Sequence, residues 1–364
     1  MKGHILQRSF LLALVVLAAL VFVLGVIYLD PGEGKTQTAE PVKSAPASIP
    51  ADEPVAKVAT VLSPSVVQIN VTGIQQTPYG AQKEEGIGSG VIYRSDGYII
   101  TNNHVVEGSR SVEIAFADGT TERGQVVGTD PTTDIAVVKV GRDDLPAASF
   151  ANGDPLVGQM AVAVGSPSGF ESTVTSGIIS GTRREVPAQI TGGRQETSLV
   201  DLIQSDAAIS PGNSGGALAD REGRVIGINV AYLPPGQTGA ENIGFAIPSD
   251  TAVSVADQLI ENGEAVHPYL GVYLSDLTQE TASKFGSPVD SGALVEKVEP
   301  GGPADAAGIQ RGDVVIAAGS EDVRSSGDLV SALRDYQPGD TVDLTVLRNG
   351  EKSKLQVNLA ERPQ

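Results

Sequence analysis

The chain has no cysteine, no tryptophan and only three histidines, and aromatic residues make up just 4% of its 364 residues. The absence of cysteine excludes disulfides, thiolate metal sites and cysteine nucleophiles. With so few aromatic side chains, we do not expect a platform that stacks nucleobases. Three scattered histidines without cysteine offer no cluster of metal ligands, so we predict neither a metal nor another cofactor.

Basic residues are scarce as well. The 25 Lys and Arg stand against 44 Asp and Glu, which gives a formal net charge of −19. Such a balance argues against nucleic acid as a partner and provides no basic surface for anionic lipid. The remaining composition, 40% hydrophobic and 19% charged with 43 glycines, is that of a globular chain with many loops. The length accommodates two or more domains.

One long apolar run without a charged side chain stands near the N-terminus, over residues 10–29. It is long enough for one transmembrane helix. Basic residues precede it and acidic residues follow it, so the positive-inside rule keeps residues 1–9 cytoplasmic and exports the remainder. A cleaved signal peptide is the alternative, although the run is longer than a usual signal core and lacks an Ala-x-Ala-like site at its end. We predict an anchor, followed by a flexible linker over residues 30–54.

Short β-type runs separated by turns fill residues 55–262, which predicts a mainly β domain built as a barrel or a sandwich. Strands do not alternate with helices, and this disfavours a doubly wound hydrolase. Two long polar insertions, 74–85 and 183–201, interrupt the pattern. The expected strands are 66–71, 90–93, 98–101, 111–116, 124–127, 135–140, 161–164, 173–180, 225–230 and 243–247.

At the end of this domain, the spacing of apolar residues changes from that of a strand to that of a helix. Apolar residues at helical spacing predict a helix over residues 249–262, with Ser249 or Asp250 as its cap. Residues 263–364 then form a second, smaller domain with further β-type runs and one short helix over residues 328–336. An Asn-Gly turn near its end favours a hairpin.

The serine at position 214 lies in the sequence Gly-Asn-Ser-Gly-Gly. Glycines on both sides let the backbone form a tight turn that projects the hydroxyl outward. The turn of Gly212, Asn213 and Ser214 is the predicted oxyanion hole, with the N–H groups of Gly212 and Ser214 as donors. A loop without chemistry is the alternative, unless the chain also supplies a base and a group that orients it.

The candidate base is His104. It is the one histidine within the β domain, since His4 precedes the apolar run and His267 lies in the link between the domains. The candidate orienting group is Asp134, because a carboxylate at the start of an apolar strand is costly unless it has a partner. Asp130, beside a proline in a turn, is the competing candidate.

The order His104, Asp134, Ser214 is that of the chymotrypsin type and differs from subtilisin and from α/β hydrolases. A serine hydroxyl is a weak nucleophile alone, so we expect His104 to accept its proton during attack. Asp134 would hold the imidazole in the useful tautomer. The three residues together predict peptide hydrolysis through an acyl-enzyme.

The motifs that surround these residues occupy positions 101–106, 134–137, 165–169, 206–216 and 244–248. Taken together, they resemble the HtrA/Deg family of serine proteases, most of all its membrane-anchored, single-PDZ, DegS-like members. The resemblance extends from about Val55 to the C-terminus. Two departures are visible: Ala217 stands where the family often has proline, and Ser210 stands where asparagine is common.

The resemblance implies a chymotrypsin-like double β-barrel of two perpendicular six-stranded barrels, with the triad between them and one PDZ domain after them. It also implies an activation loop over residues 201–212, and a specificity pocket bordered by residues 231–242 that suits a small or medium apolar side chain. Plain core packing is the alternative for Ile243 and Phe245. The implied pocket residues are Ile209, Ser210, Ile243, Gly244 and Phe245.

In the second domain, Tyr269, Leu270 and Gly271 match the PDZ loop that binds a C-terminal carboxylate on backbone N–H groups while the peptide adds to a strand edge. By the same resemblance, residues 183–201 sense PDZ occupancy and residues 74–85 can cover a neighbouring active site. The family further implies a homotrimer. The expected partners are protein substrates, C-terminal peptides and the membrane.

We therefore expect a PDZ-regulated serine endopeptidase of the cell envelope, with both domains on the extracytoplasmic side, periplasmic or extracellular. It would cleave unfolded or stress-signalling proteins, and a narrow regulatory cleavage competes with broad quality control. The alternative is a peptide-binding chaperone or scaffold whose protease fold is catalytically silent.

Overall fold

The computed structural model describes residues 53–77, 80–166, 173–187, 198–210, 212–232, 243–285, 287–334 and 336–362. Within these ranges no helix is long and apolar enough to cross a membrane. The predicted span at residues 10–29 and nearly all of the predicted linker lie outside them.

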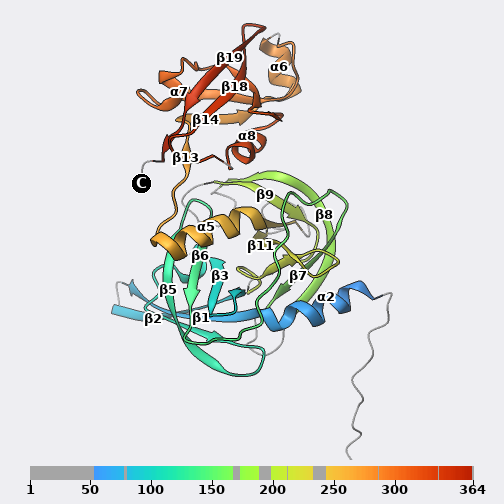
Figure 1. Ribbon diagram of the computed structural model, residues 1–364, viewed down its shortest axis with the longest axis vertical. Helices are drawn as coiled ribbons and strands as arrows, with labels where there is room; N and C mark the ends of the chain where they lie inside the picture. The colour runs from blue at the N-terminus through green and yellow to red at the C-terminus, as the bar shows by residue number, and fades with distance from the viewer. Residues whose placement is uncertain are drawn as a thin grey trace, which may run out of the picture. The chain divides into compact units, whose positions relative to one another are not determined.

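Six antiparallel strands close the first barrel in the order β1-β2-β3-β6-β5-β4 (Figure 1). Its core consists mainly of valine and isoleucine, whose branched side chains suit a pleated sheet surface. The elements are β1 (Val66–Thr77), β2 (Gly80–Arg94), β3 (Tyr98–Asn102), the short helix α3 (Asn103–Val106), β4 (Ser111–Ala115), β5 (Thr121–Asp130) and β6 (Ile135–Lys139).

The second barrel closes in the order β10-β11-β12-β9-β8-β7. Two of its strands, β9 and β10, are absent from the sequence-based expectations, although the predicted double barrel itself is confirmed. The strands are β7 (Met160–Gly165), β8 (Thr173–Val186), β9 (Leu199–Ser205), β10 (Ala217–Ala219), β11 (Val225–Tyr232) and β12 (Gly244–Pro248).

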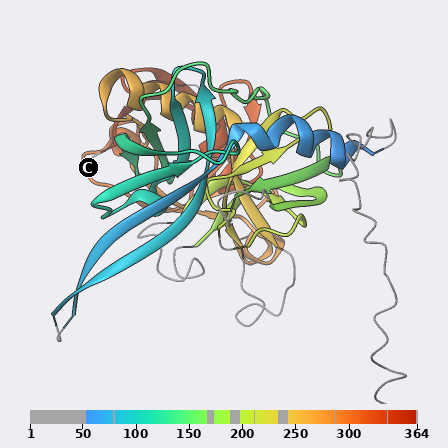
Figure 2. The same ribbon diagram turned by 90° about the horizontal axis from the view of Figure 1, so that it is seen from below.

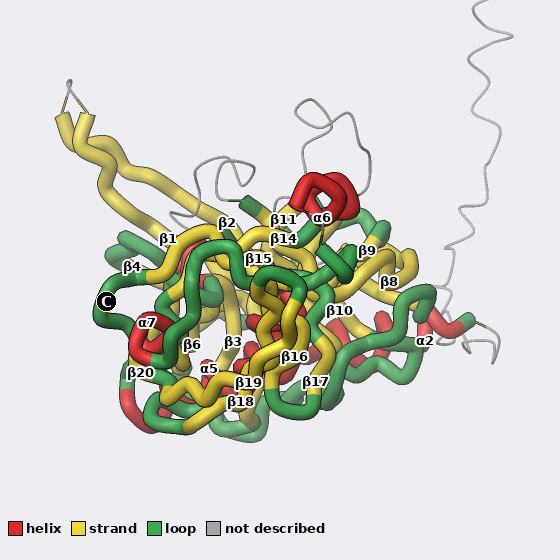
Figure 3. Tube along the Cα trace, turned by 90° about the horizontal axis from the view of Figure 1, so that it is seen from above, coloured by secondary structure: helices red, strands yellow, loops and turns green. Residues whose placement is uncertain are grey.

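The insertion expected at residues 74–85 is a continuation of two strands. β1 and β2 stay paired from Val66↔Val91 out to Thr77↔Gly80. Figures 2 and 3 show the two strands leaving the barrel together as a long ribbon. Cross-strand bonds satisfy the backbone of this polar segment, which therefore needs no apolar period to be ordered.

Two helices flank the barrels. Helix α2 (Pro54–Leu62) starts with a proline, a residue that suits the first turn, and buries Val58 and Leu62 in the core. The sequence predicts no helix there. It lies next to the 3₁₀ turn η1 (Ser63–Ser65), which leads into β1.

Helix α5 (Ser249–Asn262) has the predicted bounds but not the predicted cap. Its N-cap is Pro248, and neither candidate side chain caps the helix. Ser249 Oγ donates to Ala151 O at 2.7 Å, and Asp250 Oδ2 accepts the Gly153 N–H at 2.8 Å. Both side chains therefore bind backbone groups of the segment before β7 and do not cap their own helix.

Helix α5 follows the second barrel in the chain and yet binds the first. Asp257 of the helix accepts hydrogen bonds from Arg94 at 2.6 Å and from the hydroxyl of Tyr93 at 2.9 Å. A Cβ on Gly128 of β5 would lie 2.7 Å from Gly263 O at the C-terminal end of the helix. Because the helix also packs against β11 and β12, it joins the second barrel to the first.

The C-terminal domain is a sheet in the order β14-β15-β16-β18-β19, with β17 beside β16, and β13 and β20 pair where the domain begins and ends. The predicted Asn-Gly hairpin joins β18 to β19, and Asn349 (φ 53°) and Gly350 (φ 86°) take the left-handed conformation that such turns require. The elements are β13 (Pro268–Tyr269), β14 (Val272–Asp276), α6 (Gln279–Phe285), β15 (Ala293–Val298), α7 (Pro303–Ala306), β16 (Val314–Ala318), β17 (Glu321–Asp322), α8 (Ser326–Leu333), β18 (Thr341–Arg348), β19 (Glu351–Asn358) and β20 (Ala360–Glu361).

The link between the domains is held by a buried aspartate. His267 Nε2 lies 2.9 Å from Oδ2 of Asp130, which is 5% exposed. Burial alone would raise the pKa of Asp130, but the hydrogen bond and charge of His267 and the bonds from Thr133 and Thr132 outweigh it, so the pKa lies below its usual value. Asp130, the competing candidate for the orienting group, therefore has a different partner.

Candidate active site

His104 and Asp134 form a buried pair at one end of the first barrel. The turn between β5 and β6 puts Asp134 in the left-handed region (φ 59°), which aspartate tolerates better than most residues. Its carboxylate accepts the His104 backbone N–H at 2.9 Å and lies 2.7 Å from His104 Nδ1. Asp134 is 1% exposed, and the His104 side chain is 12% exposed.

Two further bonds hold the same aspartate by its backbone. The Asn103 N–H and the Asn102 side-chain amide both donate to Asp134 O at 3.0 Å. These bonds fix the backbone of Asp134, while the two bonds from His104 and an exposure of 1% hold its carboxylate away from water. The carboxylate favours the tautomer with a proton on Nδ1 and leaves Nε2 of His104 as an acceptor.

Ser214 lies on the turn that precedes β10 in the second barrel. Gly212 (φ 96°) and Gly215 (φ 81°) take conformations that L side chains rarely adopt. A Cβ on Gly215 would also lie 2.2 Å from Ser89 O, so the turn has no room for one. Ser214 Oγ lies 3.4 Å from Val230 O, and no hydrogen bond joins the described side chains of Ser214 and His104. Catalytic hydrogen bonds are often long before substrate binds.

The backbone N–H groups of the predicted oxyanion hole differ in their partners. The Asn213 N–H donates to Ser210 O at 2.9 Å, so Asn213 offers no free donor. The N–H groups of Gly212 and Ser214 have no acceptor in the part of the chain that the structure describes. These two remain the candidate donors.

The five predicted pocket residues do not behave alike. Ile209 is 6% exposed and packs on Gly244, where a Cβ would lie 2.7 Å from the Ile209 Cδ1 atom. Phe245 is 6% exposed and belongs to the main core cluster, and Ile243 packs against that cluster. Ser210 is exposed beside the catalytic turn. All three apolar members thus belong to a core cluster or pack against one, Ser210 is exposed, and the pocket itself stays a prediction.

The segment implied as an activation loop is partly a strand, since its first five residues belong to β9. Its remaining part is anchored to β8. Asp206 Oδ1 accepts the Ile178 N–H at 2.6 Å, and Thr175 Oγ1 donates to Ala208 O at 2.8 Å. A Cβ on Gly177 would lie 2.2 Å from Asp206 Oδ1. The sequence indicated no role for Asp206, because this partner lies on another strand.

The predicted carboxylate loop of the second domain comes between β13 and β14. Leu270 O accepts the Ala304 N–H and Gly271 O accepts the Glu299 N–H, both at 2.9 Å, so these carbonyls point into the domain. Tyr269, Leu270 and Gly271 line a cavity of about 490 Å³ together with residues of α8 and β9. Residues of β14 line the same cavity.

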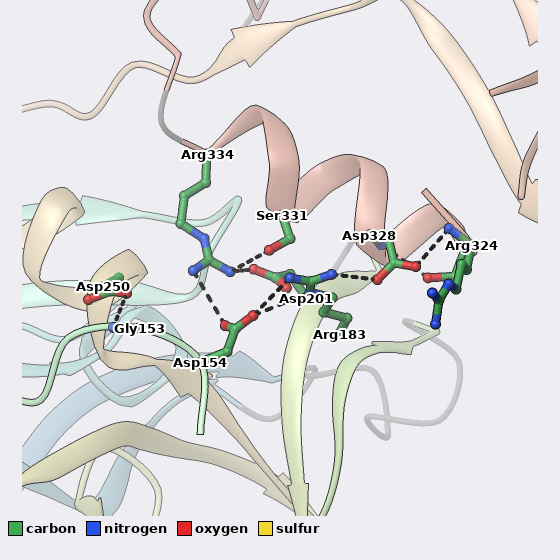
Figure 4. A network of polar contacts seen from close by, with 10 residues as sticks. Gly153, Asp154, Arg183, Asp201, Asp250, Arg324, Asp328, Ser331 and Arg334 are labelled. Atoms are coloured by element: carbon green, nitrogen blue, oxygen red, sulfur yellow. Dashed lines mark hydrogen bonds and ion pairs between the residues drawn. The ribbon is translucent and has the colours of Figure 1, made fainter. Parts of the chain in front are cut away.

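Ion pairs connect α8 to the second barrel (Figure 4). Arg183 of β8 donates to Asp328 of α8 at 3.0 Å and lies 3.1 Å from Asp154. Arg334, which follows α8, pairs with Asp201 of β9 and lies 4.0 Å from Asp154. Burial by itself would lower the pKa of Arg183, but the bond to Asp328 and the charge of Asp154 raise it.

Two of the three protease-domain residues at this contact have unusual backbones. Arg183 (φ 55°) and Asp201 (φ 61°) take the left-handed conformation, which favours glycine. A Cβ on Gly327 of α8 would lie 2.3 Å from Arg183 O, so the helix fits closely against β8. Strand β9 continues from Asp201 towards the catalytic turn, which connects this contact to the site.

Two six-stranded barrels with a buried aspartate–histidine pair on one and a glycine-framed serine on the other define a chymotrypsin-like serine protease, here followed by a PDZ domain. The family models agree with both parts. Residues 88–228 match the trypsin-like peptidase domain, and residues 268–359 match the PDZ domain.

Two curated proteins and one solved structure indicate which family of serine proteases the chain resembles. The probable periplasmic serine endoprotease DegP-like of Marinomonas sp. is 38% identical over 290 residues, 79% of this chain and 60% of that protein. The serine protease Do-like HtrA of Bacillus subtilis is 36% identical over 325 residues, 83% of this chain and 71% of that protein. The solved structure of the HtrA-type protease AlgW with decapeptide has a TM-score of 0.64 at 34% identity and covers 85% of this chain and 99% of that one.

The chain therefore belongs to the HtrA family of serine proteases. It spans 60 to 62% of the length of three of the curated relatives that it matches.

Proposed function

We propose that the chain is a serine endopeptidase in which Ser214 is the nucleophile, His104 the general base and Asp134 the group that orients it. The observation that carries the proposal is the double anchorage of His104, whose backbone N–H and Nδ1 both bind one buried carboxylate. A neutral imidazole held in this way has a single acceptor, Nε2, which a general base requires.

The reaction follows from this arrangement. Ser214 Oγ bonds to the carbonyl carbon of the peptide as its proton passes to Nε2 of His104. The electron pair of the carbonyl moves to its oxygen, which the N–H groups of Gly212 and Ser214 stabilise. His104 then gives the proton to the leaving amine as the C–N bond breaks. Water repeats the sequence on the acyl-enzyme, releases the acid product and restores Ser214.

Covalent labelling and proteolysis test the proposal together. A fluorophosphonate probe should label one residue, identified by peptide mapping as Ser214, because only an activated serine displaces fluoride from phosphorus at a useful rate. The same preparation should cleave unfolded casein at internal bonds. No labelling, with casein intact even after C-terminal peptides are added, would instead support a scaffold or chaperone with a silent protease fold.

We further propose that the PDZ domain binds the C-termini of unfolded or stress-signalling proteins beside β14. The cavity at Tyr269, Leu270 and Gly271 supports this, and AlgW is described in complexes with a decapeptide and a tripeptide. We also propose a homotrimer anchored to the cell membrane by residues 10–29, with both domains on the extracytoplasmic side. Relatives described as periplasmic support this location.

Regulation would act through the contact between α8 and the second barrel. Asp328→Asn removes the charge that holds Arg183, and Gly327→Ala places a methyl group against Arg183 O. If this contact restrains β9, either variant should raise basal casein cleavage about two- to fivefold, the low end of allosteric coupling, since the Arg183 pair is partly exposed. The measurement is the initial rate without added peptide.

Asp290→Asn is the matched control, because Asp290 is an exposed carboxylate of the same domain whose hydrogen bond among the described residues is with its neighbour Ser291. Its basal rate should equal that of the wild type. Unchanged or lower rates in both Asp328→Asn and Gly327→Ala would show that docking of α8 does not restrain the protease.

A further inference from the structure

Ser89 of β2 is fully buried between the two barrels. Its hydroxyl donates to Gly212 O at 2.6 Å and accepts the Ser166 N–H at 2.8 Å. Its own N–H donates to Ser214 O at 2.8 Å, and its carbonyl accepts the Thr101 hydroxyl at 2.7 Å. One residue of the first barrel thus holds two carbonyls of the turn that carries the serine of the second barrel.

These bonds hold the Gly212–Asn213 and Ser214–Gly215 peptide planes, which flank the plane that carries the Ser214 N–H and so restrict where that N–H can point. In a trans peptide, the C=O of one residue and the N–H of the next point in opposite directions. Ser89 holds Gly212 O on one side, and the Asn213 N–H accordingly reaches Ser210 O on the other, at 2.9 Å. The Gly216 N–H binds Asn213 O at 2.9 Å, which directs the Ser214 N–H away from the interior of the turn.

The shape of this turn depends on such bonds more than on sterics. Gly212 and Gly215 leave the backbone free to take several conformations, and that freedom includes ones in which the Ser214 N–H is misaligned. A serine hydroxyl is suited to restrain it because it can donate and accept at the same time. Ser89 uses both capacities, on Gly212 O and on the Ser166 N–H.

We propose that Ser89 is a positioning residue for the peptidase reaction, and that its hydroxyl fixes the Gly212 carbonyl and thereby aligns the donors of the oxyanion hole. The proposal rests on the proposed function. Ser89 touches neither the substrate nor the reacting atoms and acts only through Gly212 and Ser214. Its loss should therefore affect the transition state more than substrate binding.

The test is the kinetics of Ser89→Ala with a chromogenic peptide. Loss of one oxyanion-hole donor lowers kcat by about 10²- to 10³-fold, so a misaligned hole should lower it by about 10- to 10²-fold, with KM within about twofold. The rate of fluorophosphonate labelling should fall by the same factor, because the phosphoryl oxygen uses the same hole. The apparent pKa of kcat/KM should not move, since the described contacts of Ser89 include neither His104 nor Asp134. Ser89→Cys, with a weaker donor of similar shape, should be intermediate.

Ser249→Ala is the control for the loss of a buried hydroxyl. Ser249 is 1% exposed and donates to Ala151 O at 2.7 Å, away from the catalytic turn. It should lower Tm about as much as Ser89→Ala does and leave kcat unchanged. Should Ser89→Ala fail to fold, the ratio of kcat between Ser89→Cys and wild type decides instead.

The outcomes separate the two proposals. Wild-type kcat in a folded Ser89→Ala or Ser89→Cys variant, or a rise in KM alone, would overturn the positioning role and leave the peptidase intact. A wild-type protein that is neither labelled nor active would overturn the peptidase itself, and the positioning role with it. A selective loss of kcat with an unchanged pH profile would establish both.

Discussion

Replacement of Ser214 by alanine should lower kcat for peptide cleavage by about 10⁶-fold and change the free energy of unfolding by less than about 1 kcal/mol. The loss is this large because the base and the orienting carboxylate have nothing to activate once the hydroxyl is gone. What remains is the contribution of the oxyanion hole and of substrate binding. Stability is spared because the one hydrogen bond of the Ser214 side chain among the described residues is long, 3.4 Å to Val230 O.

The measurement pairs casein degradation with thermal unfolding of the same preparation. Ser214→Ala should show no fluorophosphonate labelling, a Tm close to that of the wild type, and undiminished binding of a C-terminal peptide to the PDZ domain. That last result separates loss of chemistry from loss of structure. Cleavage above about 1% of the wild-type rate in a preparation free of other proteases would place the nucleophile elsewhere.

Much of the architecture could be predicted because it depends on local patterns. Alternating apolar residues and turn dipeptides indicate most strands of both barrels, and the 3.6-residue period gives helix α5 its bounds from Ser249 to Asn262. The Asn-Gly turn at 349–350 needs left-handed residues, which the dipeptide supplies. The pair of His104 and Asp134 was also accessible, because a carboxylate at the start of an apolar strand requires a partner.

The remaining features depend on partners far away in the sequence. Asp130 looks like a turn residue locally, and nothing nearby predicts a bond to His267, 137 positions later. The capping signal at Ser249 fails for the same reason, since its hydroxyl binds Ala151 instead of its own helix. Ser89 is likewise an ordinary strand serine until the fold brings Gly212 to it, 123 positions later. Tertiary contacts decide which of several local options a polar side chain takes.

Asp134→Asn should lower kcat by about 10⁴-fold with little change in KM. The amide keeps the size of the carboxylate, and its oxygen can still accept the His104 backbone N–H, now 2.9 Å from Oδ1. Its NH₂ group, however, would donate to Nδ1 of His104, which stabilises the tautomer with the proton on Nε2. That imidazole cannot accept the proton of Ser214. Steady-state kinetics on a chromogenic peptide, with circular dichroism to confirm folding, measures the effect.

Asp130→Asn, the same substitution four positions upstream, is the matched control. Its kcat should stay within about threefold of the wild type, because Asp130 binds His267 and not His104.

Asp130→Asn should instead lower the stability of the fold, since the lowered pKa of Asp130 means that its charged form is favoured by folding. That contribution is present above the unfolded-state pKa of about 4 and is lost as the pH falls through the lower folded-state value. The Tm difference from the wild type should thus be largest near neutral pH and shrink in acid. Equal losses of kcat in the two variants would mean that Asp134 has no special role in orienting His104.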